Sequence, residues 1–129
     1  MTHASRTVLV VDDDVMMGEL MAAIIDSADY HTVIAADGVQ GVQLAQSASP
    51  AVVFCDFSMP GMNGEDVLRS LRADPRTAGI PLILMSGHAP SDLNALGADA
   101  FLQKPFSFDE VLPLISSLLQ PNYACAAVA

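Results

Sequence analysis

Four apolar segments of this chain each end in a side chain that could take part in chemistry. VLVV is followed by Asp12 and Asp13, VVFC by Asp56, LILM by Ser86, and FLQ by Lys104. Taken singly, each has an ordinary explanation as a turn or a solvated helix start. Lys104, however, is the only lysine in the sequence, so a general scatter of lysines over the surface does not explain its position.

Together these side chains would suit phosphoryl transfer. Carboxylates held within a few ångströms of one another repel, and each then favours its protonated form. A divalent cation relieves the repulsion, and oxygen-only ligation with room for waters and a phosphate is typical of Mg²⁺. An anionic group arriving at Asp56 would meet the cation on one side and Lys104 on the other, with the Ser86 hydroxyl as a further donor. Positioning and charge neutralisation supply most of the catalysis in such sites.

Alternating strands and helices must hold these residues. Short apolar or β-branched runs predict strands at 7–11, 31–35, 51–56, 80–85 and 100–103. Apolar residues at spacings of three and four, together with capping residues, predict helices at 15–26 and 38–46, after Asn63, and at 107–120. A short helix at 93–96 is the most that fits between the last two strands, and Pro113 should bend the last helix or loosen its first turns.

Five such strand–helix units imply an α/β fold, a doubly wound parallel sheet with helices on both faces. Right-handed crossovers bring the carboxyl ends of all the strands to one edge, which is where ligands bind in open sheets. The four polar strand ends should therefore converge. The pattern also predicts which helical residues pack inward: Met17, Leu20, Met21, Ile24 and Ile25 in the first helix, and Val39, Val42 and Ala45 in the second.

Composition limits the class of protein and its partners. A chain of 129 residues forms one domain, and 15 acidic against 5 basic residues give a net charge of −10. This charge opposes direct binding to nucleic acid or to anionic membranes, so proteins and cations are the expected partners. No stretch approaches the roughly 18 apolar residues of a membrane helix, and residues 1–6 lack the apolar core of a signal peptide, so we expect a cytoplasmic location.

The chain resembles the receiver domains of two-component response regulators. The segments that carry the resemblance are VLVVDDD, VVFCDFSMPGMNG, LILMSG and FLQKPF, in this order and at these spacings. The resemblance implies a flavodoxin-like (βα)5 fold with a five-stranded parallel sheet in the order 2-1-3-4-5. It places the receiver domain at residues 7–120, with a disordered N-terminus at 1–6 and a tail at 121–129 too short for an output domain, which implies a stand-alone receiver.

The resemblance also implies roles for residues around the acidic cluster. Asp56 matches the phosphoacceptor, Asp13 a direct Mg²⁺ ligand, and Asp12 its acidic neighbour, which holds metal-bound water. The backbone carbonyl of Ser58 matches the remaining protein ligand. The phosphoryl donor would be a histidine kinase or a histidine phosphotransferase, as in a phosphorelay, and the switch would control contact with a further protein.

Other residues match positions that couple or tune the switch. Ser86 matches the switch hydroxyl, Lys104 the phosphate-binding lysine, and Phe101 the switch aromatic. Phe101 lacks a hydroxyl, so it could report a rotamer change only through packing, and remaining in the core is an equal alternative. Ser58 and His88 match positions that influence how long the phosphoryl group survives. The alternative for His88 is a solvent-exposed histidine in a loop.

Two alternative functions belong to other classes of protein. In a small phosphatase of the haloacid dehalogenase type, Asp12 would be the nucleophile and Asp14 the acid, but Asp56 would then have no role. In an interaction module that works without phosphorylation, the intact acidic pair, acceptor, serine and lysine would be unexplained.

The outer face of the first helix suggests where a donor docks. Val15, Met16, Gly18 and Ala22 lie off its core stripe, so the surface beside the acidic pair should be apolar and built from small or flexible side chains. A helical bundle that carries the donor histidine could dock there, although Met16 packing against a neighbouring loop is almost as good an explanation.

Overall fold

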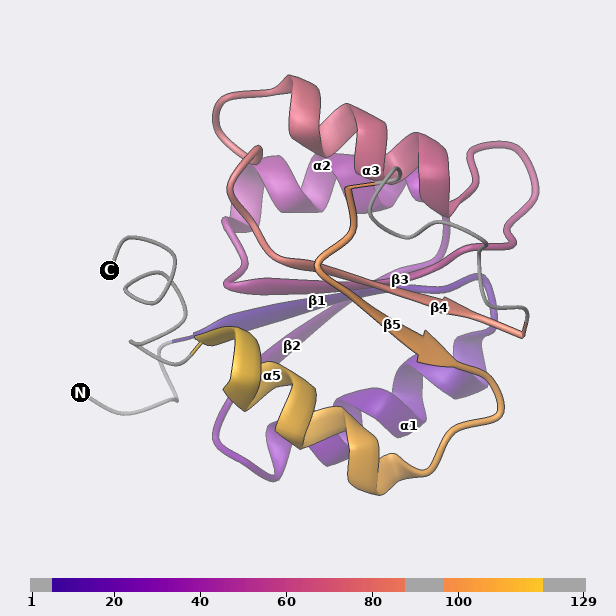
Figure 1. Ribbon diagram of the computed structural model, residues 1–129, viewed down its shortest axis with the longest axis vertical. Helices are drawn as coiled ribbons and strands as arrows, with labels where there is room; N and C mark the ends of the chain where they lie inside the picture. Colours follow the sequence, from indigo (N-terminus) through magenta and orange to yellow (C-terminus); the bar gives the residue numbers. More distant parts are fainter. Residues whose placement is uncertain (1–5, 88–96, 120–129) are drawn as a thin grey trace.

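A five-stranded parallel sheet forms the centre of the protein in the computed structural model, which describes residues 6–87 and 97–119. The strand order is β2-β1-β3-β4-β5, as predicted (Figure 1). All neighbouring pairs are parallel, so the strands' carboxyl ends lie along one edge. The strands are β1 (Thr7–Val11), β2 (His31–Ala35), β3 (Val52–Asp56), β4 (Leu82–Ser86) and β5 (Ala100–Gln103).

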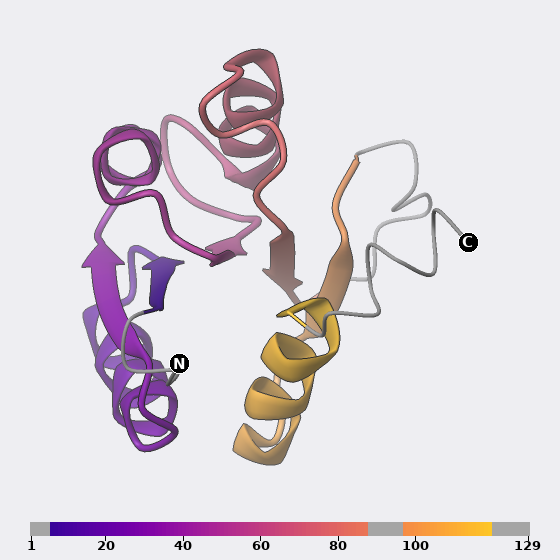
Figure 2. The ribbon, with the colours of Figure 1, turned by 90° about the vertical axis from the view of Figure 1, so that its left-hand side faces the viewer.

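Helices cover both faces of this sheet. The helices α1 and α5 lie on one face, and α2 and α3 lie on the other (Figures 1 and 2). Their bounds are α1 (Val15–Asp26), α2 (Gly38–Ala48), α3 (Gly64–Ala73) and α5 (Val111–Leu119), with a short 3-10 helix η2 (Phe108–Glu110) before α5. No helix in the described part of the chain is long and apolar enough to cross a membrane.

Alternating side chains of the buried strands form two separate cores. Val8, Val10 and Phe54 point to the α1 and α5 face, where they pack with Met21 and Ile115. Their neighbours Leu9, Val11 and Val53 point to the α2 and α3 face, where they pack with Leu68 and Leu71. All five residues of β3 and of β4 are buried, which explains why these strands read as unbroken apolar runs.

Most element boundaries agree with the sequence pattern. The first, second and fifth strands and the first helix have the predicted bounds, while β3 begins one residue later and α2 extends two residues further than predicted. Ser107 and Glu110 form the expected capping box. The turn after this capping box is 3-10 rather than α-helical. Pro113, the third residue of α5, explains this, because proline lacks the backbone N–H that an α-helical turn would require there. The predicted helix at 93–96 lies outside the described residues.

Three predictions of helix orientation are wrong. Leu20 was expected in the core, but its exposed fraction is 44%, and Val39 is exposed as well. Gly18 was expected on the outer face of α1, yet it is buried, and a Cβ built on it would lie 3.1 Å from Ile34 Cγ2. Spacing alone could not give these results, because it does not reveal that a glycine faces the sheet. Two residues correspond to about 200° around a helix, so Leu20 points away from the face on which Gly18 lies.

The helix α2 approaches the sheet closely at Gly41. A Cβ on this residue would lie 2.8 and 2.9 Å from the two γ-carbons of Val11, the last residue of β1. Val11 directly precedes Asp12 in the chain. The absence of a side chain at Gly41 therefore lets α2 pack beside the strand end that presents the acidic pair.

We predict that Gly41→Ala destabilises the protein. Alanine favours a helix interior over glycine by about 1 kcal/mol, but overpacking a tight contact costs about 1–3 kcal/mol, so the net loss in stability should be at most about 2 kcal/mol. Urea unfolding measures it, with the exposed Gln43→Ala in the same helix as control. A midpoint for Gly41→Ala equal to or above that of the control would show that the contact is not tight.

Candidate functional site

Three carboxylates meet at the carboxyl edge of the sheet. Asp12 follows β1 directly, Asp13 is the next residue, and Asp56 is the last residue of the neighbouring strand β3. One oxygen from each lies within 4.8 Å of the others. Asp12 and Asp56 are only 1% and 6% exposed, whereas Asp13 is exposed. The convergence expected from the strand order is therefore present.

Two of the three consecutive aspartates, Asp12 and Asp14, make different hydrogen bonds. Asp12 donates its N–H to the carbonyl of Ala35 at 3.0 Å, and its Oδ1 accepts the N–H of Asp14 at 2.9 Å. Asp14 is the N-cap of α1, and its carboxylate accepts the N–H groups of Met16 and Met17. Because its carboxylate caps the helix, Asp14 is not placed as the acid that the phosphatase interpretation requires.

Lys104 bridges two of the carboxylates. Its Nζ lies 3.3 Å from Asp12 Oδ2 and 3.3 Å from Asp56 Oδ1. The backbone N–H of Lys104 donates to the backbone carbonyl of Ser86 at 2.7 Å, and this bond fixes the end of β5 to the end of β4. Burial lowers the pKa of Lys104, but the charges of Asp12 and Asp56 and their hydrogen bonds outweigh this effect, so the pKa lies above its ordinary value.

Opposing effects act on the pKa of Asp56. Burial raises the pKa of its carboxyl group, and the charge of Asp12 raises it further. Lys104 and the N–H of Ser58 lower it, but not enough to restore the ordinary value, so the pKa remains raised. The site therefore holds more negative charge than one lysine neutralises, which is the condition that a divalent cation relieves.

The chain leaves Asp56 through a tightly packed loop. The N–H of Phe57 donates to the carbonyl of Met85, and the N–H of Gly64 donates to the carbonyl of Phe57. A Cβ on Gly64 would lie 2.7 Å from the carbonyl oxygen of Asp56, so only glycine lets α3 begin here without moving the strand end. Asn63 forms a capping box with Asp66, as its position predicted for a helix start. The role of Gly64 was not predicted from the sequence, although a glycine directly after a cap residue was a usable signal.

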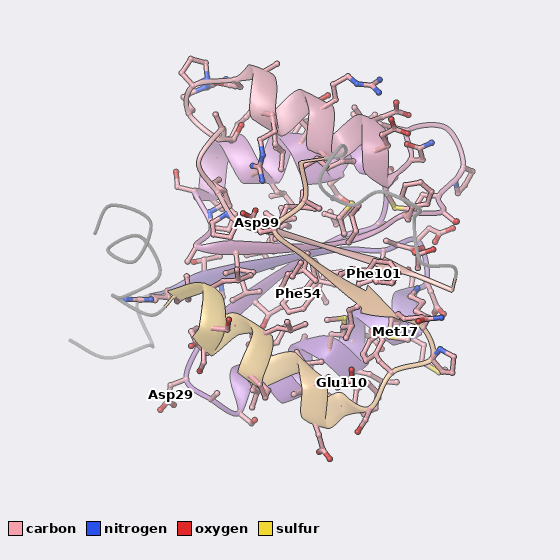
Figure 3. All side chains as sticks on the ribbon, in the orientation of Figure 1. Met17, Asp29, Phe54, Asp99, Phe101 and Glu110 are labelled. Carbon is pink, nitrogen blue, oxygen red and sulfur yellow. The ribbon has the colours of Figure 1, made fainter. Side chains whose placement is uncertain are left out.

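The remaining candidates lie on strands or loops at or near this edge. Ser86 is buried at the end of β4, and Ser58 is exposed in the loop after β3. Phe101 is half-buried in β5 and packs against the core on the α2 and α3 face (Figure 3). His88 lies outside the described residues. Cys55, beside Asp56, is fully buried, and burial raises the pKa of its thiol, so it is a packing residue and not a nucleophile.

Comparison with known proteins agrees with this geometry. The sequence profile of the response regulator receiver domain matches residues 8–116. The DNA-binding response regulator MtrA of Mycobacterium tuberculosis strain H37Rv is 32% identical over 121 residues, which are 91% of this chain but 52% of MtrA. The hybrid signal transduction histidine kinase D of Dictyostelium discoideum is 31% identical over the same share of this chain, only 8% of its own length. The chain thus spans about half the length of the MtrA relatives.

Solved structures give the same result. The chemotaxis protein CheY4 of Vibrio cholerae superposes with a TM-score of 0.83 at 26% identity, covering 88% of this chain and 98% of that one. The receiver domain of the Francisella response regulator 1452 gives a TM-score of 0.79 at 27% identity, covering 88% and 95%.

The chain belongs to the response regulator receiver domain family. Receiver domains are phosphorylation switches rather than metabolic enzymes; they bind Mg²⁺ at an acidic site and take phosphoryl groups from histidine kinases. The acidic pocket of Asp12, Asp13 and Asp56 fits such a phosphorylation site. The haloacid dehalogenase alternative is not favoured.

The raised pKa of Asp56 makes stability depend on pH. Between the ordinary value of 3.8 and the raised pKa, the folded protein retains a proton that the unfolded chain has released, so stability falls as pH rises through this window. Asp56→Asn removes the charge and should raise the urea midpoint above that of the wild type at pH 7. The gain should shrink as pH is lowered towards 3.8. Glu19→Gln, an exposed change on α1, is the control; a gain that does not depend on pH would contradict this electrostatic origin.

Proposed function

We propose that the chain accepts a phosphoryl group on Asp56 from a phosphohistidine donor, and that this reaction switches its contacts with another protein. The convergence of three carboxylates with Lys104 at the sheet edge carries the proposal. Asp12, Asp13, Asp56 and the carbonyl of Ser58 would hold Mg²⁺. When bound, the cation would neutralise the charge that the carboxylates and phosphoryl oxygens bring together.

The reaction requires little of the protein beyond positioning. An Asp56 carboxylate oxygen forms the new P–O bond as the P–N bond of the phosphohistidine breaks, and the electron pair of that bond stays on the donor's imidazole. Burial of Asp56 orients its carboxylate and limits access of water to it. The same site would catalyse phosphorylation from small donors and the later hydrolysis of the acyl phosphate.

Coupling to the rest of the molecule would begin at Lys104. Its Nζ pairs with Asp12 and Asp56 before phosphorylation and would turn to the phosphoryl oxygens afterwards. The hydroxyl of Ser86 would contact the same oxygens, and Phe101 would respond through packing if it changes rotamer. Ser58 and His88 would tune the lifetime of the phosphorylated state.

The donor would dock on the exposed face of α1. Met16 is 69% exposed, and Val15 and Leu20 on the same helix are also exposed. Residues 7–68 contain no lysine or arginine, while Glu19 and Asp26 on α1 are exposed. A histidine kinase or phosphotransferase helix with an apolar face bordered by basic side chains would complement this surface.

Labelling by a small donor tests the acceptor. Acetyl phosphate with Mg²⁺ should add one phosphoryl group to the wild type, and chelation of the metal should abolish the addition. Intact-mass and peptide mass spectrometry should place it on Asp56, and Asp56→Asn should remain unlabelled. Phosphorylation of Asp12 instead would overturn the proposal and revive the phosphatase interpretation.

Substitution of Met16 tests the docking face. Met16→Glu should slow transfer from a phosphorylated histidine phosphotransfer protein about thirtyfold, because losing one interface hot spot costs about 2 kcal/mol. Labelling by acetyl phosphate should be unchanged. Ala23→Glu adds the same charge two helical turns further from the site and is the matched control. If both donors slow equally with Met16→Glu, the substitution has damaged the site itself and docking has no support.

A further inference from the structure

Arg72 joins separate segments at the edge of the sheet opposite the carboxylates. It lies near the end of α3, and its Nη1 donates to the carbonyls of Ala78 and Ile80 at 3.1 and 2.8 Å. Its Nη2 donates to the carbonyl of Gly97 at 3.3 Å and pairs with Asp99 Oδ2 at 2.8 Å. One side chain therefore fixes the connection from α3 to β4 and the entry to β5 together.

Asp99 continues this connection into the sheet. Its Oδ2 also accepts the N–H of Leu82, the first residue of β4, at 2.9 Å, and its own N–H donates to the carbonyl of Leu82 at 2.9 Å. The side chains of Arg72 and Asp99 are 28% and 24% exposed, so solvent weakens this ion pair less than one on the open surface. Figure 3 shows Asp99 at the start of β5, with Phe101 further along the same strand.

β5 depends on these contacts because it is a four-residue strand at the edge of the sheet. Among the strands of the described residues it pairs only with β4, and Leu102 is its one fully buried side chain. Its far end continues into Lys104, whose N–H is bound to the carbonyl of Ser86. The strand thus has one end held by Arg72 through Asp99 and the other end in the acidic site.

We propose that Arg72 is a positioning residue for Lys104, acting through the placement of β5 on β4. Lys104 is five positions after Asp99, which corresponds to about 16 Å along an extended strand. This exceeds the Debye length of about 8 Å at physiological ionic strength, so the charge of Arg72 has little direct effect on the site. A displaced strand, in contrast, would carry the Lys104 ammonium with it. The effect on phosphate binding rests on the proposed function, whereas the placement of β5 rests on the structure alone.

Amide hydrogen exchange tests the structural half. In Arg72→Ala, the Lys104 amide should exchange about tenfold faster, whereas the amides of Asp12 and His31, bonded within the β1–β2 region, should keep their rates. Arg69→Ala is the matched control, because Arg69 lies in the same helix and pairs with Glu65 and Asp66 at the surface. Should Arg72→Ala not fold, Asp99→Asn removes the ion pair yet keeps an acceptor for Leu82. An unchanged Lys104 rate, or an equal rise at every amide, would overturn the proposal.

Binding of beryllofluoride with Mg²⁺ tests the functional half by a double-mutant cycle. Arg72→Ala should weaken binding several-fold in the wild type but not in the Lys104→Ala background, because the effect passes through Lys104. Equal weakening in both backgrounds would overturn the proposed route. If the wild type fails to bind beryllofluoride at Asp56, the proposed function fails, and the exchange rates still decide the role of Arg72.

Discussion

Mutual repulsion among carboxylates at one edge of the sheet is the constraint on which the rest of this structure depends. Asp12 and Asp56 are buried side by side because β1 and β3 are adjacent parallel strands that end together. A single lysine, 3.3 Å from each, balances them only partly, and the pKa of Asp56 stays raised. The unphosphorylated site therefore has an affinity for further positive charge. The ammonium group of Lys104 is already paired with Asp12 and Asp56, and it would have to leave them to bind a phosphoryl group.

This arrangement makes the position of the strand ends important. Gly41 lets α2 pack against the end of β1, and Gly64 lets α3 begin against the end of β3. At β5, which supplies Lys104, the contacts of Arg72 and Asp99 hold the opposite end of the strand. Residues that touch no phosphate thus determine where the charged groups stand, and a small displacement of any strand end would change the electrostatic balance.

Much of the fold could be predicted from the sequence, because buried parallel strands and capped helices have strong local signals. The bounds of the first helix, the strand order and the convergence of Asp12, Asp13, Asp56 and Lys104 all followed from pattern, or from resemblance. The rotation of the helices did not follow. Leu20 and Val39 are exposed because each lies two positions, or about 200° around its helix, from a glycine that faces inward, Gly18 or Gly41. Nor could the pattern reveal the pairing of Arg72 with Asp99, since residues 27 positions apart carry no local signal of contact.

A structure of the protein with Mg²⁺ and beryllofluoride tests the central claim most directly. We expect beryllofluoride on one carboxylate oxygen of Asp56, and Mg²⁺ held by Asp12, Asp13, Asp56 and the Ser58 carbonyl. Lys104 Nζ should have moved from Asp12 to a fluorine atom. The hydroxyl of Ser86 should contact the same group. Beryllofluoride on another aspartate, or Lys104 still paired with Asp12 beside an occupied Asp56, would contradict it.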